Sequence, residues 1–249
     1  MRAPAAELRK LATLPGVWIG AAVGLVAPPA ITVIAARQAA SYGVGADADD
    51  GYQGLALMGV VGAIVIGVLS VSSEYRAEDA ESGGGRPIAT ALVVRPGRFG
   101  LLAAKLAAVG VVVAVLAAVA TAGTLTTSAL ASDVPLRLLD SGELVREAGV
   151  VVFWVLTAWI AQGITLLTRG GVVPLAVLII NSSLVSVSYL LSRVIPAANY
   201  LPDVAGFSMF IRTRETTVDV APAAGGLVML LWTAAVVAAA AIVFHRRDA

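Results

Sequence analysis

Hydrophobic residues run along this chain in charge-free stretches of about 20 residues, the length of helix that crosses a hydrocarbon core about 30 Å thick. Barrel strands would alternate instead, and backbone groups inside a bilayer must be paired within their own segment. The pattern therefore predicts a single-domain, all-α integral membrane protein. Its six transmembrane helices are expected at about 11–36, 52–73, 106–127, 148–168, 172–192 and 225–244.

Polar segments interrupt this pattern. Among them, 74–105 is the best surface for a water-soluble partner, because nearly everything around it is predicted to be lipid-facing helix. Residues 1–10 predict an amphipathic helix at the membrane interface; a basic tail is the alternative, and a cleaved signal peptide is disfavoured by the long apolar run that follows. The segment 193–224 is too apolar for a solvated loop, so one or two short interfacial or re-entrant helices are expected there.

Small residues recur at near-helical spacing in the first two predicted spans. Such residues let helices approach closely, either within one chain or between subunits, and packing within the chain is the favoured interpretation. They are Gly16, Gly20 and Gly24 in the first span and Gly59, Ala63 and Gly67 in the second.

Basic residues predict the orientation. With both termini inside, the cytoplasmic segments hold eleven Lys and Arg residues and the external segments hold six. The positive-inside rule then places both termini and the 74–105 loop in the cytoplasm, and 193–224 outside.

Composition narrows the chemistry. The 249 residues are 59% hydrophobic and 13% charged, against about 25% charged in an average soluble domain. There is no Cys, and His245 is the single histidine, so disulfides, thiolate metal sites and bis-histidine haem are excluded. The preference for Arg over Lys and the abundance of Ala, Val and Gly are typical of GC-rich coding, and they favour a bacterial cell membrane.

No catalytic machinery is visible in the sequence. Neither GGGRPIAT nor GRFGLLAAK has the spacing of a phosphate-binding loop, so this chain is not expected to be an enzyme, and any ATP must bind another subunit. No Asp, Glu, Lys or Arg falls inside the six predicted spans, which argues against an ion-coupled carrier.

Uncharged polar residues in the fourth and fifth predicted spans are the candidates for a substrate path. Hydrogen bonding between helices is the alternative role. Ser182, Ser186 and Tyr189 recur at helical spacing and would share one face. A lining of this kind suits amphipathic drugs, peptides or lipids alike. The candidates are Thr157, Gln162, Asn181, Ser182, Ser186 and Tyr189.

Several short motifs resemble the permease subunit of type 2 ATP-binding-cassette exporters. The segment ELRKLATLPGVW, 7–18, resembles the family's interfacial helix and first span. Glu74 followed by ATALVVRPGRFGLLAAK resembles its cytoplasmic loop, NYLPDVAG the segment before its last span, and FHRRDA its ending. The resemblance implies a dimer with a second copy or a related permease, and two separate ATPase subunits that bind ATP. Lipid is the remaining expected partner, and nucleic acid is not expected.

The resemblance also implies a short coupling helix in the 74–105 loop that docks on the ATPase. Reversing the charge of Glu74 or Arg98 is then expected to weaken ATPase association. The acidic and glycine-rich interval 77–86 departs from the family pattern and leaves the docking register open. A membrane assembly or sensor protein that binds a soluble partner without transport is the alternative function. The coupling residues implied are Glu74, Arg76, Ile88, Leu92, Arg95, Pro96, Arg98 and Lys105.

Overall fold

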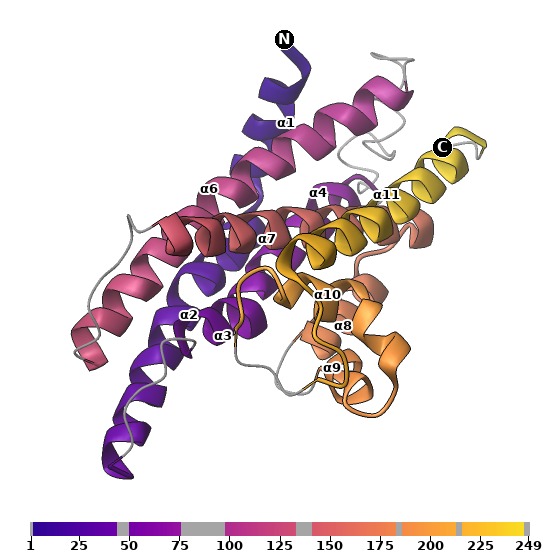
Figure 1. Ribbon diagram of the computed structural model, residues 1–249. Coiled ribbons are helices and arrows are strands. Elements are labelled where there is room, and N and C mark those ends of the chain that lie inside the picture. Colours follow the sequence, from indigo (N-terminus) through magenta and orange to yellow (C-terminus); the bar gives the residue numbers. More distant parts are fainter. Residues whose placement is uncertain are drawn as a thin grey trace.

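The structure, a computed structural model, describes residues 2–43, 50–75, 98–132, 141–182, 186–212 and 216–246. Every regular element in these residues is a helix, which confirms the predicted class (Figure 1). In chain order they are α1 (Arg2–Thr13), α2 (Pro15–Ser41), α3 (Asp50–Gly54), the π-helix η1 (Leu55–Gly59), α4 (Val60–Tyr75), α6 (Arg98–Ser132), α7 (Ser141–Thr168), α8 (Val172–Ser182), α9 (Val187–Ser192), the 3-10 helix η3 (Pro196–Tyr200), α10 (Pro202–Phe207) and α11 (Pro222–Arg246).

Five helical segments of the described chain are long and apolar enough to cross a membrane. They are α2, the continuous segment Gly51–Tyr75 formed by α3, η1 and α4, and the long helices α6, α7 and α11. These correspond to the first, second, third, fourth and sixth predicted spans, and most extend beyond the predicted limits. Together they indicate a multi-pass membrane protein.

The predicted fifth span, 172–192, has a different form. It is divided into α8 and α9, and Ser186 between them is extended, with φ −64° and ψ 104°. The Ser186 hydroxyl accepts a hydrogen bond from the backbone N–H of Tyr189, which caps the start of α9. Neither helix is long enough to cross a bilayer alone. Hydrophobicity located this segment, but a polar cap interrupts the helix.

The N-terminal helix is confirmed, and it is separate from the first long helix. α1 ends at Thr13, and Leu14 is extended with φ −87° and ψ 112°. Pro15 then occupies the first turn of α2, where its missing N–H costs no hydrogen bond, and it disfavours helical dihedrals in the preceding residue. The predicted first span therefore begins at Pro15 and not at Leu11.

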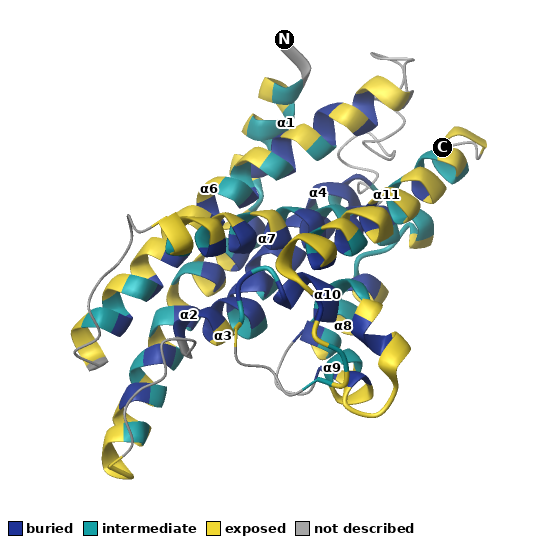
Figure 2. Ribbon diagram, viewed as in Figure 1, coloured by how far each residue is buried: buried dark blue, intermediate teal, exposed yellow. Residues whose placement is uncertain are grey.

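The middle of the molecule is formed by α4 and α7, which are the most buried long helices (Figure 2). α2 and α6 pack on one another and against α4, whereas α11 packs on α7 and on α10. Within their apolar stretches, 72% of residues are buried in Gly51–Tyr75 but only 17% in α11. The large apolar side chains exposed on α2, α6, α8 and α11 suit contact with lipid.

Glycine contacts explain the close approach of α2 and α4. A Cβ atom at Gly62 would lie 2.5 Å from the carbonyl oxygen of Gly20 and 3.0 Å from the Cα of Gly24. Similarly, a Cβ at Gly67 would lie 2.5 Å from the carbonyl oxygen of Ala158 in α7. The small residues of the predicted spans thus serve packing within the chain, as expected.

The short helices carry the chain from one end of the bundle to the other. Gly171, before α8, contacts Ser72 near the end of α4. Phe210, after α10, instead accepts a hydrogen bond from Arg146 near the start of α7. α11 then returns to the first end, where the rings of His245 and Phe99 stack with centroids 5.3 Å apart. Both termini lie at this end (Figure 1).

Candidate functional site

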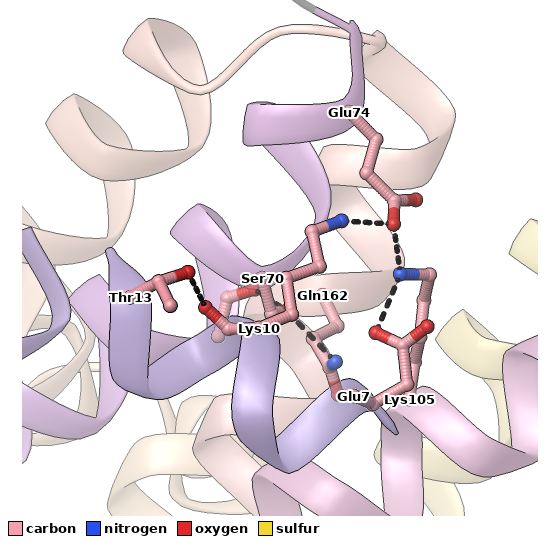
Figure 3. A network of polar contacts seen from close by, with 8 residues as sticks. Glu7, Lys10, Thr13, Ser70, Glu74, Lys105 and Gln162 are labelled. Carbon is pink, nitrogen blue, oxygen red and sulfur yellow. Dashed lines mark hydrogen bonds and ion pairs between the residues drawn. The ribbon is translucent and has the colours of Figure 1, made fainter. Parts of the chain in front are cut away.

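An ion cluster joins three helices at the end of the bundle where the termini lie. Glu74 sits in the last turn of α4, Lys105 in the second turn of α6, and Glu7 and Lys10 on one face of α1. Lys10 and Lys105 both pair with Oε1 of Glu74, and Nζ of Lys105 lies 3.0 Å from Oε2 of Glu7 (Figure 3). The four charges alternate in sign, so the cluster is neutral overall.

The centre of this cluster is buried. The side chains of Glu74 and Lys105 are 3% and 4% exposed, whereas that of Lys10 is 32% exposed. Removing charges from water is costly, and the cost is offset only while both partners remain in place. Glu74 receives two cations on one oxygen, and its Oε2 is buried without a hydrogen-bond partner among the described residues. Glu74 is therefore the member whose loss leaves the most charge uncompensated.

The two limits of the predicted coupling loop meet in this cluster. Glu74 lies in the last turn of α4, before the loop, and Lys105 lies in the second turn of α6, after it. The two residues form an ion pair. Their side chains are inside the protein, so they hold the loop's two helices together and offer little surface to a partner. Arg98 lies in the first turn of α6. The other predicted coupling residues lie outside the described residues; they are Arg76, Ile88, Leu92, Arg95 and Pro96.

Sequence reasoning missed two members of the cluster, Glu7 and Lys10. A signal was present, because these residues are three apart and so share one face of the predicted amphipathic helix. The partner of that face was not predictable, since 64 residues separate Lys10 from Glu74 and 98 separate Glu7 from Lys105.

The predicted substrate-path residues do not form one lining. Nε2 of Gln162 donates a 2.9 Å hydrogen bond to Oγ of Ser70, which ties α7 to α4 (Figure 3). Thr157 donates to the carbonyl oxygen of Phe153 within its own helix, at 2.8 Å. Both side chains are buried. These contacts match the alternative role of hydrogen bonding within and between helices.

Two of the other predicted path residues, Asn181 and Ser186, contact a carboxylate on α10. Nδ2 of Asn181 and Oγ of Ser186 donate to Oδ2 of Asp203, at 2.9 and 3.2 Å. Oδ1 of Asn181 accepts from Oγ of Ser188 at 3.0 Å, and Ser182 is buried close by in sequence. The backbone N–H of Tyr189 is used by the Ser186 cap. This polar cluster fixes α8, α9 and α10 relative to one another.

Burial raises the pKa of the Asp203 carboxyl, and hydrogen bonds that include those from the backbone of Val204 and the side chain of Asn181 partly oppose the rise. The folded protein thus holds this proton more strongly than the unfolded chain, where the pKa is about 3.9. The contribution of the Asp203 carboxyl to the free energy of unfolding is therefore greatest at low pH, and it falls as the pH rises through the folded-state pKa.

We expect Asp203→Asn to reduce this pH dependence, because the amide has no proton to lose. The midpoint of thermal unfolding in detergent at pH 4, 6 and 8 measures this pH dependence. The midpoint of the variant should rise relative to that of the original protein as the pH rises. Asp219→Asn is the matched control, since Asp219 is exposed on the same segment. An identical pH dependence in the original protein and the Asp203 variant would contradict the assignment.

A second buried cation lies at the opposite end of the bundle. Arg146 donates from Nε to the carbonyl oxygen of Phe210 at 2.9 Å, and its Nη1 lies 3.1 Å from Oε2 of Glu143. Its guanidinium also covers the ring of Tyr52, at 3.8 Å from the centroid, and the Tyr52 hydroxyl donates to Glu143 at 2.9 Å. The group ties α3, α7 and the segment after α10 together.

These arrangements hold helices together. Among the described residues, no set of three or more His, Asp or Glu side chains could hold a metal ion. Comparison with models of known families, with curated proteins and with solved structures found no match. A functional assignment therefore rests on the fold, the ion cluster and the resemblance of the short motifs.

Proposed function

We propose that this chain is the membrane-spanning permease subunit of an ATP-driven exporter of the type 2 ATP-binding-cassette class. It forms the substrate pathway as a dimer with a second copy or a related permease, in a bacterial cell membrane. It binds no cofactor itself, and separate ATPase subunits bind and hydrolyse ATP. The loop 74–105 couples it to those subunits.

The observation that carries this proposal is the ion cluster at the base of the loop. Glu74 and Lys105 join the helices that enter and leave the loop, and both also pair with α1. A force applied to the loop by a partner would therefore reach α1, α4 and α6 together. A coupling loop needs this kind of rigid mounting, because a flexible base would absorb the motion of the ATPase.

The arrangement of the short helices also supports the proposal. The segment 172–192, with α8 and α9, supplies the proposed sixth crossing in two pieces beside the five long helices. With six crossings both termini and the 74–105 loop share one side, which the basic residues favour as the cytoplasm. The proposed substrate path runs beside α8 and α9.

Co-purification with an ATPase tests the proposal directly. The tagged chain is expressed with candidate ATPase subunits, with priority to any encoded by a neighbouring gene, and recovered in mild detergent. Recovery of an ATPase, together with loss of export of a compound when the chain is depleted, is the expected result. Recovery of a soluble protein that is no ATPase, with export unchanged, would favour an assembly or sensor protein.

We expect Arg98→Glu to lower ATPase recovery about tenfold, since reversing a charge at an interface typically costs more than about 1.4 kcal/mol. Arg37→Glu is the matched control, because Arg37 is exposed near the other end of α2, on the opposite side of the bundle. Both variants should reach the membrane in equal amounts by quantitative blotting. Equal ATPase recovery with both would count against the coupling role of Arg98.

A further inference from the structure

A groove of about 280 Å³ opens beside the turn between α7 and α8, at the end of the bundle that carries the termini. One wall is the end of α4, from Leu69 to Tyr75. The other wall is the turn between α7 and α8 together with the start of α8. Its lining residues are Leu69, Ser72, Tyr75, Arg169, Val172 and Leu175, with Gly170 and Gly171 in the turn. The ion cluster and the Asp203 cluster contribute none of these residues.

The chemistry of the groove is mixed. Arg169 supplies a permanent positive charge, and Ser72 and Tyr75 supply hydroxyl donors. Leu69, Val172 and Leu175 supply an apolar wall. Val172 and Val173 are 81% and 60% exposed on the outer side of α8, so this wall continues into a face suited to lipid tails. A cation next to a lipid-facing apolar wall matches a phosphate headgroup joined to an acyl chain.

The backbone holds Arg169 in an unusual conformation. Its φ is +53°, and it is the one non-glycine residue of the described chain with a positive φ. Residues other than Gly and Asn rarely adopt a positive φ. An arginine in this conformation can therefore indicate a function. The turn is also pressed against α4, since a Cβ at Gly171 would lie 2.9 Å from Oγ of Ser72. The position of Arg169 beside α4 is thereby fixed.

The charge of this end of the bundle selects the kind of lipid. Its described acidic residues, Glu7 and Glu74, are engaged with Lys10 and Lys105 in the ion cluster. In the sequence, the segments predicted on this side of the membrane hold eleven Lys and Arg residues against six Asp and Glu residues, which gives this side a net positive charge. A basic surface at a membrane interface attracts anionic lipid over zwitterionic lipid.

We propose that the groove is a binding site for an anionic phospholipid, with Arg169 at the headgroup phosphate and an acyl chain along Leu69, Val172 and Leu175. The bound lipid fills the gap between α4 and α8 and fastens the turn between α7 and α8 to the bundle. This inference does not depend on the proposed transport function, because it concerns the surface that the chain presents to its own bilayer.

Native mass spectrometry of the full-length purified chain tests the site, with phosphatidylglycerol and phosphatidylcholine supplied in equal amounts. The original protein should retain phosphatidylglycerol preferentially. Arg169→Asn removes the charge and keeps a residue that tolerates positive φ, so retention should fall about fivefold, the contribution of one basic residue near an anionic membrane surface. Arg169→Lys should keep most of the retention.

A second variant leaves Arg169 in place. Val172→Asp puts a negative charge at the mouth of the groove, at an exposed site in the first turn of α8 where an acidic residue favours the helix. Val172→Asp should lower phosphatidylglycerol retention without loss of folded protein. It therefore tests lipid binding in the groove even if the Arg169 variants fold poorly. Arg246→Gln is the control, since it removes a charge from the same end outside the groove. Unchanged retention in Val172→Asp and Arg169→Asn, an equal loss in Arg246→Gln, or equal retention of both lipids would overturn the proposal.

Discussion

Gly62→Val is expected to destabilise the protein by about 3 kcal/mol or more, the upper range for overpacking a close contact. The new Cβ would lie 2.5 Å from the carbonyl oxygen of Gly20 and 3.1 Å from the backbone N of Gly24. Both neighbours are backbone atoms of α2, so no side chain can rotate away to make room. α2 and α4 must separate, and both lose the packing that defines their contact.

The matched control is Gly123→Val in α6, where a Cβ would meet no atom within 4 Å. The two substitutions add the same side chain to a long apolar helix, and only the surroundings differ. Thermal unfolding in detergent should show a midpoint lower by about 6 to 12 °C for Gly62→Val and near the original value for Gly123→Val. Equal midpoints for the two variants would mean that α2 and α4 are not in the contact described.

Glu74→Ala is expected to cost about 3 to 5 kcal/mol, because it leaves two cations beside a buried site without their shared carboxylate. Lys105→Ala should cost less, since Glu74 keeps Lys10. Lys10→Ala should cost about 1 kcal/mol or less, because its side chain is 32% exposed and water screens the pair. Unfolding midpoints of the three variants give this order directly.

A paired substitution separates charge from packing in the cluster. Glu74→Leu combined with Lys105→Leu removes both buried charges, and Lys10 and Glu7 stay close on one face of α1. Replacing a buried ion pair by apolar side chains is often neutral, so the double variant should recover most of the stability lost in Glu74→Ala. A double variant as unstable as Glu74→Ala would show that the position needs the carboxylate for another reason.

The cluster also changes how the coupling hypothesis should be tested. Reversing the charge of Glu74 was expected from the sequence to weaken ATPase association, and a buried Glu74 would do so by loosening α1, α4 and α6. For Arg98→Glu, the unfolding midpoint of the variant shows whether a loss of ATPase recovery reflects docking or stability. A loss of ATPase with Glu74 variants is informative only beside their unfolding midpoints.

The positions of the long helices were predictable because hydrophobic length alone decides them. A charge-free run of about 20 residues has one stable solution in a bilayer. The N-terminal helix and the short helices before α11 were predictable for a related reason, since their apolar content suits an interface and their length prevents a crossing. The starts of α6 and α7 were not, because the predicted spans begin directly after charged residues, whereas the helices include Lys105 and Arg146.

The same reasoning did not predict the break within 172–192, which involves a contact between residues far apart in sequence. The helix is broken at Ser186, and the partner of Ser186 and Asn181 is Asp203 on another helix. From the sequence alone, polar residues on a common helical face predicted a lining. In the folded chain Ser186 caps α9, and Ser186 and Asn181 both donate hydrogen bonds to the buried Asp203.

The sequence by itself determined the helical class, the places of the five long helices and the small-residue stripes that pack them, because these follow from local hydrophobicity and side-chain size. Only the tertiary structure decided which charges are partners. Lys10, Glu74 and Lys105 lie in three separate segments, and their burial is tolerable only when all three helices meet. The free energy of a buried charge depends on its neighbours in space, and no local pattern records them.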